Sequence, residues 1–84
     1  MTLNELKNRL STEKHIVGAI QIECGKKIEV PGILEIFEEA GGWYVYDTND
    51  RGRVVVLDKG NEKDMTDALY RRILKTEKRQ LKKI

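Results

Sequence analysis

The sequence predicts an α+β fold, with an N-terminal helix, an antiparallel meander of about four short strands, and a C-terminal helix packed on one face of the sheet. Three observations predict it. Apolar residues recur at helical spacing towards both ends of the chain, β-favouring runs separated by turn residues fill the middle, and no segment repeats. The 84 residues, 1–84, are expected to form a single domain with a thin stability margin.

The first helix is expected over residues 2–10. Thr2 is a suitable N-cap, and Glu5 stands three residues later, as in a capping box. The polar residues that follow, 11–14, are expected to form a connection. A helix this short depends on tertiary packing of its apolar stripe. That stripe consists of Leu3, Leu6 and Leu10.

Four strands are expected in the middle of the chain, at about residues 16–23, 33–39, 43–48 and 53–57. Between the first two, Gly25-Lys26 is a turn candidate, and Pro31-Gly32 interrupts any ladder because proline has no N–H to donate. The segment 33–39 contains Glu and Leu, which also favour helices. Its short length and its Pro-Gly and Gly-Gly flanks favour a strand.

Residues 41–57 show the clearest hairpin pattern, with the only Trp and two of the three Tyr. Alternation along the first strand predicts two largely apolar faces. Turn residues at 49–52 supply the reversal, and Asp58-Lys59-Gly60 is expected to end the second strand. One face of the first strand would carry Trp43, Val45 and Asp47, and the other Tyr44, Tyr46 and Thr48.

The last helix is expected over residues 62–80. Asn61 is a good N-cap, and the acids of the first turn suit the positive end of the helix dipole. Beyond Leu74 the apolar signal thins, so the last turns are expected to project or fray. The inward stripe consists of Met65, Ala68, Leu69 and Ile73, widened by Tyr70 and Leu74.

The net charge of +2 hides a strong segregation along the chain. Residues 28–67 carry ten acids and four bases, whereas residues 68–84 carry seven bases and one acid. The acidic part suggests a partner-binding surface formed by Glu35, Glu38, Glu39, Asp47 and Asp50. The basic part suggests an alternative, a nucleic-acid-binding helix face formed by Arg71, Arg72, Lys75, Lys78, Arg79 and Lys82. Helix-end stabilisation and solubility also account for such bases.

No residue pattern indicates an enzyme, a metal site or a cofactor. His15 has no Ser or Cys nucleophile motif to serve, and Cys24 is read as a bystander although lysines follow it. Gly41-Gly42 lacks the Lys-Ser/Thr of a phosphate loop, and the acid spacing fits no calcium loop. A single cysteine and no apolar leader after Met1 predict a cytoplasmic protein with no membrane partner.

The hairpin and the closing helix together carry a family resemblance. The stretch resembles small uncharacterised proteins of Firmicutes with a Gly-x-Trp-x-Val-Tyr hairpin, and is similar to the small immunity proteins of bacterial polymorphic toxin systems. The resemblance implies a non-catalytic inhibitor that binds a cognate toxin. The matching residues are Gly41, Trp43, Val45, Tyr46, Asp50, Arg51, Gly52, Ala68, Leu69 and Tyr70.

Three functions therefore stand as hypotheses. The first is an immunity-type binding protein whose acidic surface covers a basic active site, such as that of a nuclease, and steers fast association. The second is a nucleic-acid-associated module that acts through the basic closing helix. The third is a small regulatory or structural domain without a toxin partner, such as a homodimer that covers an open sheet edge.

Overall fold

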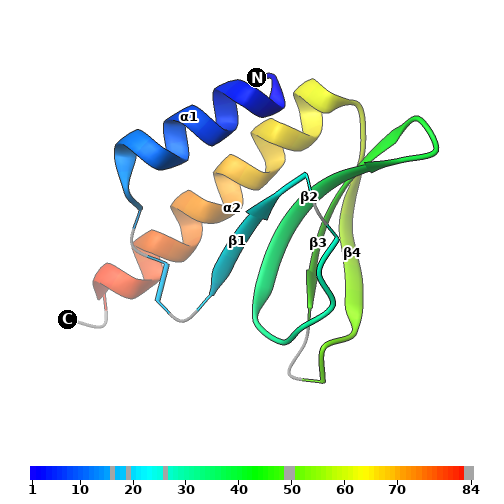
Figure 1. Ribbon diagram of the computed structural model, residues 1–84. Coiled ribbons are helices and arrows are strands. Elements are labelled where there is room, and N and C mark those ends of the chain that lie inside the picture. Colours follow the sequence, from blue (N-terminus) through cyan, green and yellow to red (C-terminus); the bar gives the residue numbers. More distant parts are fainter. Residues whose placement is uncertain (16, 19, 26, 49–50, 83–84) are drawn as a thin grey trace.

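The computed structural model describes residues 1–84 except 16, 19, 26, 49–50 and 83–84. Two helices and a four-stranded sheet form the domain (Figure 1). Helix α2 packs against the sheet, and α1 packs along α2, which confirms the predicted α+β fold. The elements are α1 (Leu3–Glu13), β1 (Gln21–Cys24), β2 (Ile33–Glu39), β3 (Gly42–Thr48), β4 (Val54–Gly60) and α2 (Glu62–Lys82).

The sheet has the strand order β1-β2-β3-β4 and is mixed. Strands β2, β3 and β4 form the predicted antiparallel meander, but β1 pairs with β2 in parallel, from Gln21 beside Ile33 to Cys24 beside Ile36. The antiparallel prediction was wrong for this first pair. In a parallel pair, the chain must return to the end of the sheet at which the first strand began before the second strand can start. Residues 25–32 make that return.

The returning segment crosses the face of the sheet that points away from α2. Ile28 N–H donates to the Glu35 carboxylate at 2.6 Å, and the Thr48 hydroxyl donates to the Val30 carbonyl. The same Thr48 oxygen accepts from Ile33 N–H at 2.9 Å. Two side chains of the sheet, Glu35 of β2 and Thr48 of β3, thus hold the backbone of this returning segment, which we call the crossover.

Several element boundaries differ from the sequence predictions, three of them by three residues or more. Helix α1 continues to Glu13 and ends where Lys14 adopts a left-handed conformation. The first strand covers residues 21–24 instead of the predicted 16–23, and residues 16 and 19 of that range lie outside the described residues. Strand β4 continues to Gly60, which pairs with Trp43, so Asp58-Lys59-Gly60 extends the strand instead of ending it.

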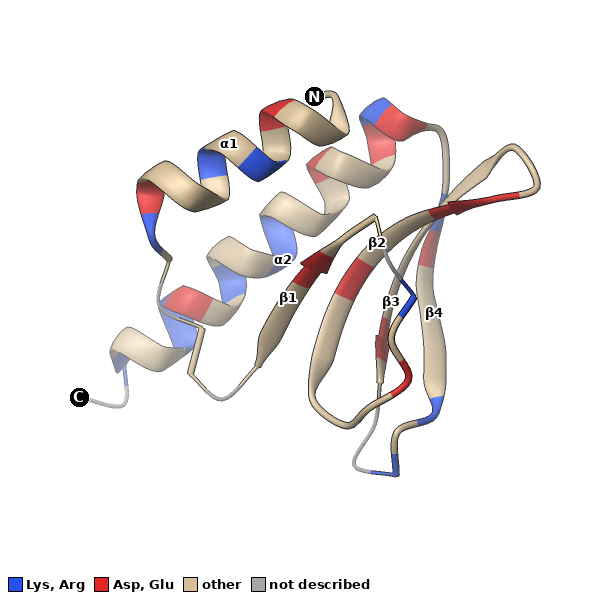
Figure 2. Cartoon of the chain, in the orientation of Figure 1, with Lys and Arg blue, Asp and Glu red and all other residues tan. Residues whose placement is uncertain are grey.

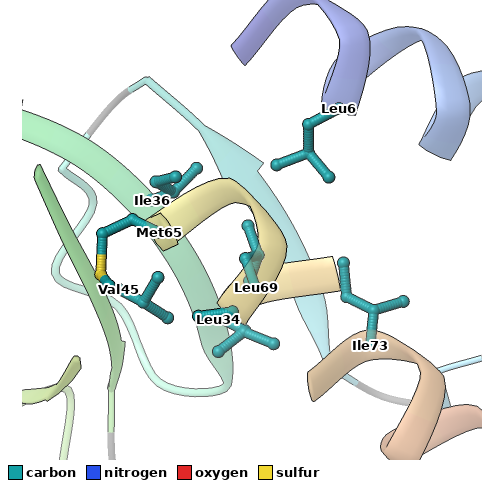
Figure 3. Packing of buried hydrophobic residues seen from close by; sticks show 8 residues of the cluster. Leu6, Leu34, Ile36, Val45, Met65, Leu69 and Ile73 are labelled. Atoms are coloured by element: carbon teal, nitrogen blue, oxygen red, sulfur yellow. The ribbon is translucent and has the colours of Figure 1, made fainter. Parts of the chain in front are cut away.

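The hydrophobic core lies between α2 and the sheet, closed on one side by α1 (Figure 3). Leu74, expected to widen the apolar stripe, is instead 40% exposed, and α2 remains helical to Lys82. The predicted projection or fraying of its last turns is therefore not seen within the described residues. The core cluster consists of Leu6, Leu34, Ile36, Val45, Met65, Ala68, Leu69 and Ile73.

The N-terminus is fixed to the first turns of α2. The buried Thr66 hydroxyl lies 2.6 Å from the Met1 carbonyl oxygen, and the terminal ammonium group lies 3.2 Å from Asp67. Leu3 N–H donates to the Glu62 carboxylate at 2.9 Å. These contacts hold α1 beside α2 although α1 is too short to be stable alone.

Candidate functional site

The first residue of the predicted acidic surface, Glu35, is in the interior. Its side chain is fully buried beside Tyr46, its register partner on β3, and supports the crossover. Burial raises the pKa of the Glu35 carboxyl group and also that of the Tyr46 hydroxyl. Glu35 therefore cannot contact a partner on the surface, which corrects its predicted role.

The other predicted acids are spread along the sheet. Glu38 and Glu39 are exposed at the end of β2, whereas Asp47 pairs with Leu34 near its start. Four strand residues separate Glu38 from the Asp47 position, roughly 13 Å. Asp50 lies outside the described residues. The described members of the predicted set do not form one surface. Glu38 and Glu39 are both exposed and consecutive on β2, with side chains on opposite faces of the strand.

Asp64 is a further acid at the end of the molecule where Glu38 and Glu39 lie, across two strand spacings, roughly 10 Å, from Glu38. Glu38 pairs with Trp43, Trp43 pairs with Gly60, and a Cβ placed on Gly60 would lie 3.9 Å from the Asp64 Cβ. The tip of the β2–β3 hairpin and the first turn of α2 therefore lie at the same end of the molecule (Figure 2). We call the exposed residues Glu38, Glu39 and Asp64 the acidic end.

Sequence reasoning missed Asp64 as part of this surface. The sequence placed Asp64 in the first turn of the last helix, as part of the N-terminal cap. Its backbone N–H donates to the Asn61 side-chain oxygen at 2.7 Å, as a capped helix requires. Its carboxylate is left exposed. The β4–α2 connection, short and fixed by the strand pairing of Gly60, places it near the hairpin.

The predicted basic residues do share one surface. At 3.6 residues per turn they fall within an arc of roughly 120° on α2. The buried Ile73 lies outside this arc, as does Glu77, which contacts His15. Five of the six are exposed and Arg72 is half-buried. We call Arg71, Arg72, Lys75, Lys78, Arg79 and Lys82 the cationic face.

One side of the cationic face borders a pocket. The Arg72 guanidinium donates to Asp58 from two nitrogens, at 3.2 and 3.0 Å. Beside this pair, a pocket of about 220 Å³ lies between α2 and the ends of the central strands. Asp47, predicted as part of the acidic surface, lies among these cations. The polar lining includes Arg72, Lys75 and Arg79 from α2, and Asp47 and Thr48 from β3.

His15 joins the ends of the two helices. Its Nδ1 lies 2.9 Å from Glu77 and its Nε2 lies 2.6 Å from Glu13. The Tyr70 hydroxyl also donates to Glu13, and the Tyr70 and His15 rings meet edge to face. The hydrogen bond to Glu77, followed by that to Glu13, raises the pKa of His15. The geometry is that of a structural ion pair between the helices.

This cluster predicts a pH dependence of stability. Because the pKa of His15 is raised in the folded protein, its contribution is complete below the ordinary value of 6.5 and is lost as the pH rises through the folded-state pKa. The unfolding free energy should fall over that window, and His15→Asn should abolish this fall. Urea unfolding across the pH range measures it. A variant with the wild-type slope would contradict the assignment.

Among the described residues, neither Cys24 nor any group of metal-binding side chains forms a further candidate site. Cys24 is half-buried, and burial raises the pKa of its thiol, which disfavours the nucleophilic thiolate. Within the described residues, no three His, Cys, Asp or Glu side chains are grouped so that they could hold a metal ion. The helices described here are also too short or too polar to cross a membrane.

Comparisons with known proteins return nothing: no protein-family model matches the chain, and neither a curated protein nor a solved structure matches it. The candidate sites therefore rest on this chain's own geometry. They are the acidic end and the cationic face with its pocket.

Proposed function

We propose that the protein is a non-catalytic, immunity-type binding protein that neutralises a bacterial toxin through its acidic end. The observation that carries the proposal is the exposed group of Glu38, Glu39 and Asp64. It lies at the opposite end of α2 from most of the cationic face. The 21 residues of α2 span roughly 31 Å, so the two charged surfaces can act separately.

The backbone holds the acidic end rigidly. Ala40 and Gly41, between β2 and β3, both have positive φ angles, as the type I′ turn of a two-residue hairpin requires. Pairing continues to the last residues before the turn, Glu39 beside Gly42. The backbone of such a hairpin loses little conformational freedom on binding, and the potential of its carboxylates would steer a basic partner towards them.

The resemblance of the hairpin to toxin-immunity proteins supplies the class of partner. A toxin with a basic active site, such as a nuclease, has the charge that these carboxylates complement. An inhibitor that covers such a site needs no catalytic group of its own. The proposal thus assigns the acidic end to recognition and the core around Trp43 to its support.

The proposal predicts that a toxin domain is encoded beside the gene for this chain, and growth of cells that express that domain tests it. The wild-type chain should restore growth, and the double variant Glu38→Lys/Glu39→Lys should not. Glu29→Lys is the matched control, because Glu29 is exposed but lies on the crossover segment. Protection by the double variant equal to that of wild type, or none by wild type, would count against the proposal.

Nucleic-acid binding is the second candidate, favoured by the six cations that share one arc of α2. Contacts to phosphates release counterions, so the affinity for DNA or RNA should fall steeply with salt concentration. Lys82→Gln should reduce the slope of log affinity against log salt by about 1. A salt-independent affinity, or no binding at low salt, would remove this candidate.

A further inference from the structure

The pocket beside Arg72 combines a cationic rim with an apolar floor. Lys75 and Arg79 are exposed at its rim, one helical turn apart on α2. Sheet residues and the segment before β1 form the floor. The apolar lining includes Ile20, Leu34 and Leu57. A ligand that fits this lining has an anionic group and an apolar body.

Only some polar side chains of the pocket lining can donate a hydrogen bond to an anion. The Thr48 hydroxyl already accepts from Ile33 N–H and donates to Val30, and the Thr76 hydroxyl donates to the Arg72 carbonyl. Neither hydroxyl is therefore free to donate into the pocket. The anion would be bound by Lys75 and Arg79, with Arg72 held in place by Asp58.

Asp47 adds a second requirement. It is half-buried in the same lining and accepts hydrogen bonds only, so it favours a ligand with a hydroxyl or amino group next to the anion. Arg72, Lys75 and Arg79 face two carboxylates, Asp47 and the Asp58 that is paired with Arg72, which leaves an excess of one positive charge. A phosphate monoester has three terminal acceptor oxygens, one more than a carboxylate, so it can accept hydrogen bonds from Lys75 and Arg79 at the same time.

We propose that this pocket binds a phosphate monoester whose organic part combines an apolar surface with a hydroxyl or amino group, such as a nucleoside monophosphate. The phosphate contacts Lys75 and Arg79, the organic part lies on Ile20 and Leu57, and a hydroxyl or amino group donates to Asp47. The ligand is either a free nucleotide or the 5′-phosphate end of a nucleic-acid strand. The inference does not depend on toxin binding, which the opposite end of the molecule serves.

Calorimetric titration of the full chain with adenosine monophosphate, inorganic phosphate and adenosine tests the proposal. The monophosphate should bind more tightly than either of the other two, because only it reaches both the rim and the floor. Lys75→Gln and Arg79→Gln should each weaken its binding about tenfold or more, since a hydrogen bond between charged groups contributes about 1.5–3 kcal/mol. An unchanged far-UV spectrum verifies that the variants are folded.

Lys78→Gln and Lys82→Gln are the matched controls, since these residues carry the same charge on the same helix but do not line the pocket. They should leave the affinity within about twofold of wild type. Equal losses in controls and pocket variants would show a diffuse charge effect and overturn the proposal. So would an affinity for the monophosphate no higher than that for inorganic phosphate.

A second titration distinguishes the two sources of the ligand. Short oligonucleotides with a 5′-phosphate or a 5′-hydroxyl differ only in the group that the pocket would hold. Tighter binding of the phosphorylated strand than of the free nucleotide, lost in Arg79→Gln, identifies a strand end. Tighter binding of the free nucleotide identifies a small-molecule site. Equal binding of the two oligonucleotides together with no binding of the nucleotide would overturn the pocket.

Discussion

Replacing Leu69 with alanine is expected to lower the unfolding free energy by about 3 kcal/mol. Leu69 has 0% exposure and lies at the centre of the core, between Ile36 and Val45 of the sheet and Leu6 of α1 (Figure 3). The substitution leaves a cavity that three elements would have to fill. In a domain of 84 residues this loss corresponds to a fall in Tm of roughly 12 °C or more.

Leu74→Ala is the matched control for this prediction. It removes the same atoms from the same helix, but Leu74 is 40% exposed and lies outside the core cluster. The expected cost is below about 1 kcal/mol. Chemical denaturation of both variants measures the difference. Equal costs would mean that α2 packs on the sheet through a different face from the one described.

Thr48→Val is expected to lower the unfolding free energy by about 2 kcal/mol although it preserves the shape of the side chain. The Thr48 oxygen accepts from Ile33 N–H and donates to the Val30 carbonyl, and the site is almost fully buried. Valine leaves both backbone groups without this partner. The crossover of residues 25–32 would then lose one of its two side-chain supports on the sheet.

Thr76→Val provides the control for Thr48. Its hydroxyl also donates to a carbonyl, that of Arg72, but within one helix and at a half-buried position. The carbonyl remains in the helical ladder, so the expected change is within about 0.5 kcal/mol. Comparable unfolding free energies for the two variants would contradict the role assigned to Thr48 in holding the parallel pair.

The features that local sequence determines were predicted well. The Thr2–Glu5 capping box is present at the start of α1, and the Asn61 side chain caps α2. Both depend on residues three positions apart, whose geometry the helix itself fixes. The cationic face belongs to the same class, because one rigid helix sets the directions of all its side chains. The position of the cationic face beside the pocket was not predicted, because the sheet residues that line the pocket come from segments far apart in the chain.

The errors on the pairing of β1 and on the burial of Glu35 share one physical cause. Strand alternation places Glu35 on a particular face of β2, but its burial depends on the crossover that covers that face. The crossover exists because β1 pairs in parallel, and this pairing involves residues far apart in the chain. The Gly25-Lys26 sequence is compatible with the start of a hairpin and with the start of a crossover, so it does not distinguish the two connections. The same pairing removes Glu35 from the predicted acidic surface, whereas Asp47 is separated from Glu38 by its distance along the strand.

The association rate with the toxin domain that we propose as partner, measured against ionic strength, tests the proposed function most directly. Stopped-flow measurements would compare wild type with two double variants, one at each charged surface. Glu38→Lys/Glu39→Lys should slow association at least tenfold at low salt, with the gap narrowing as salt screens the charges. Lys75→Gln/Arg79→Gln should leave the rate unchanged or slightly higher. The opposite pattern, with a slower rate only in the cationic variant, would contradict recognition through the acidic end.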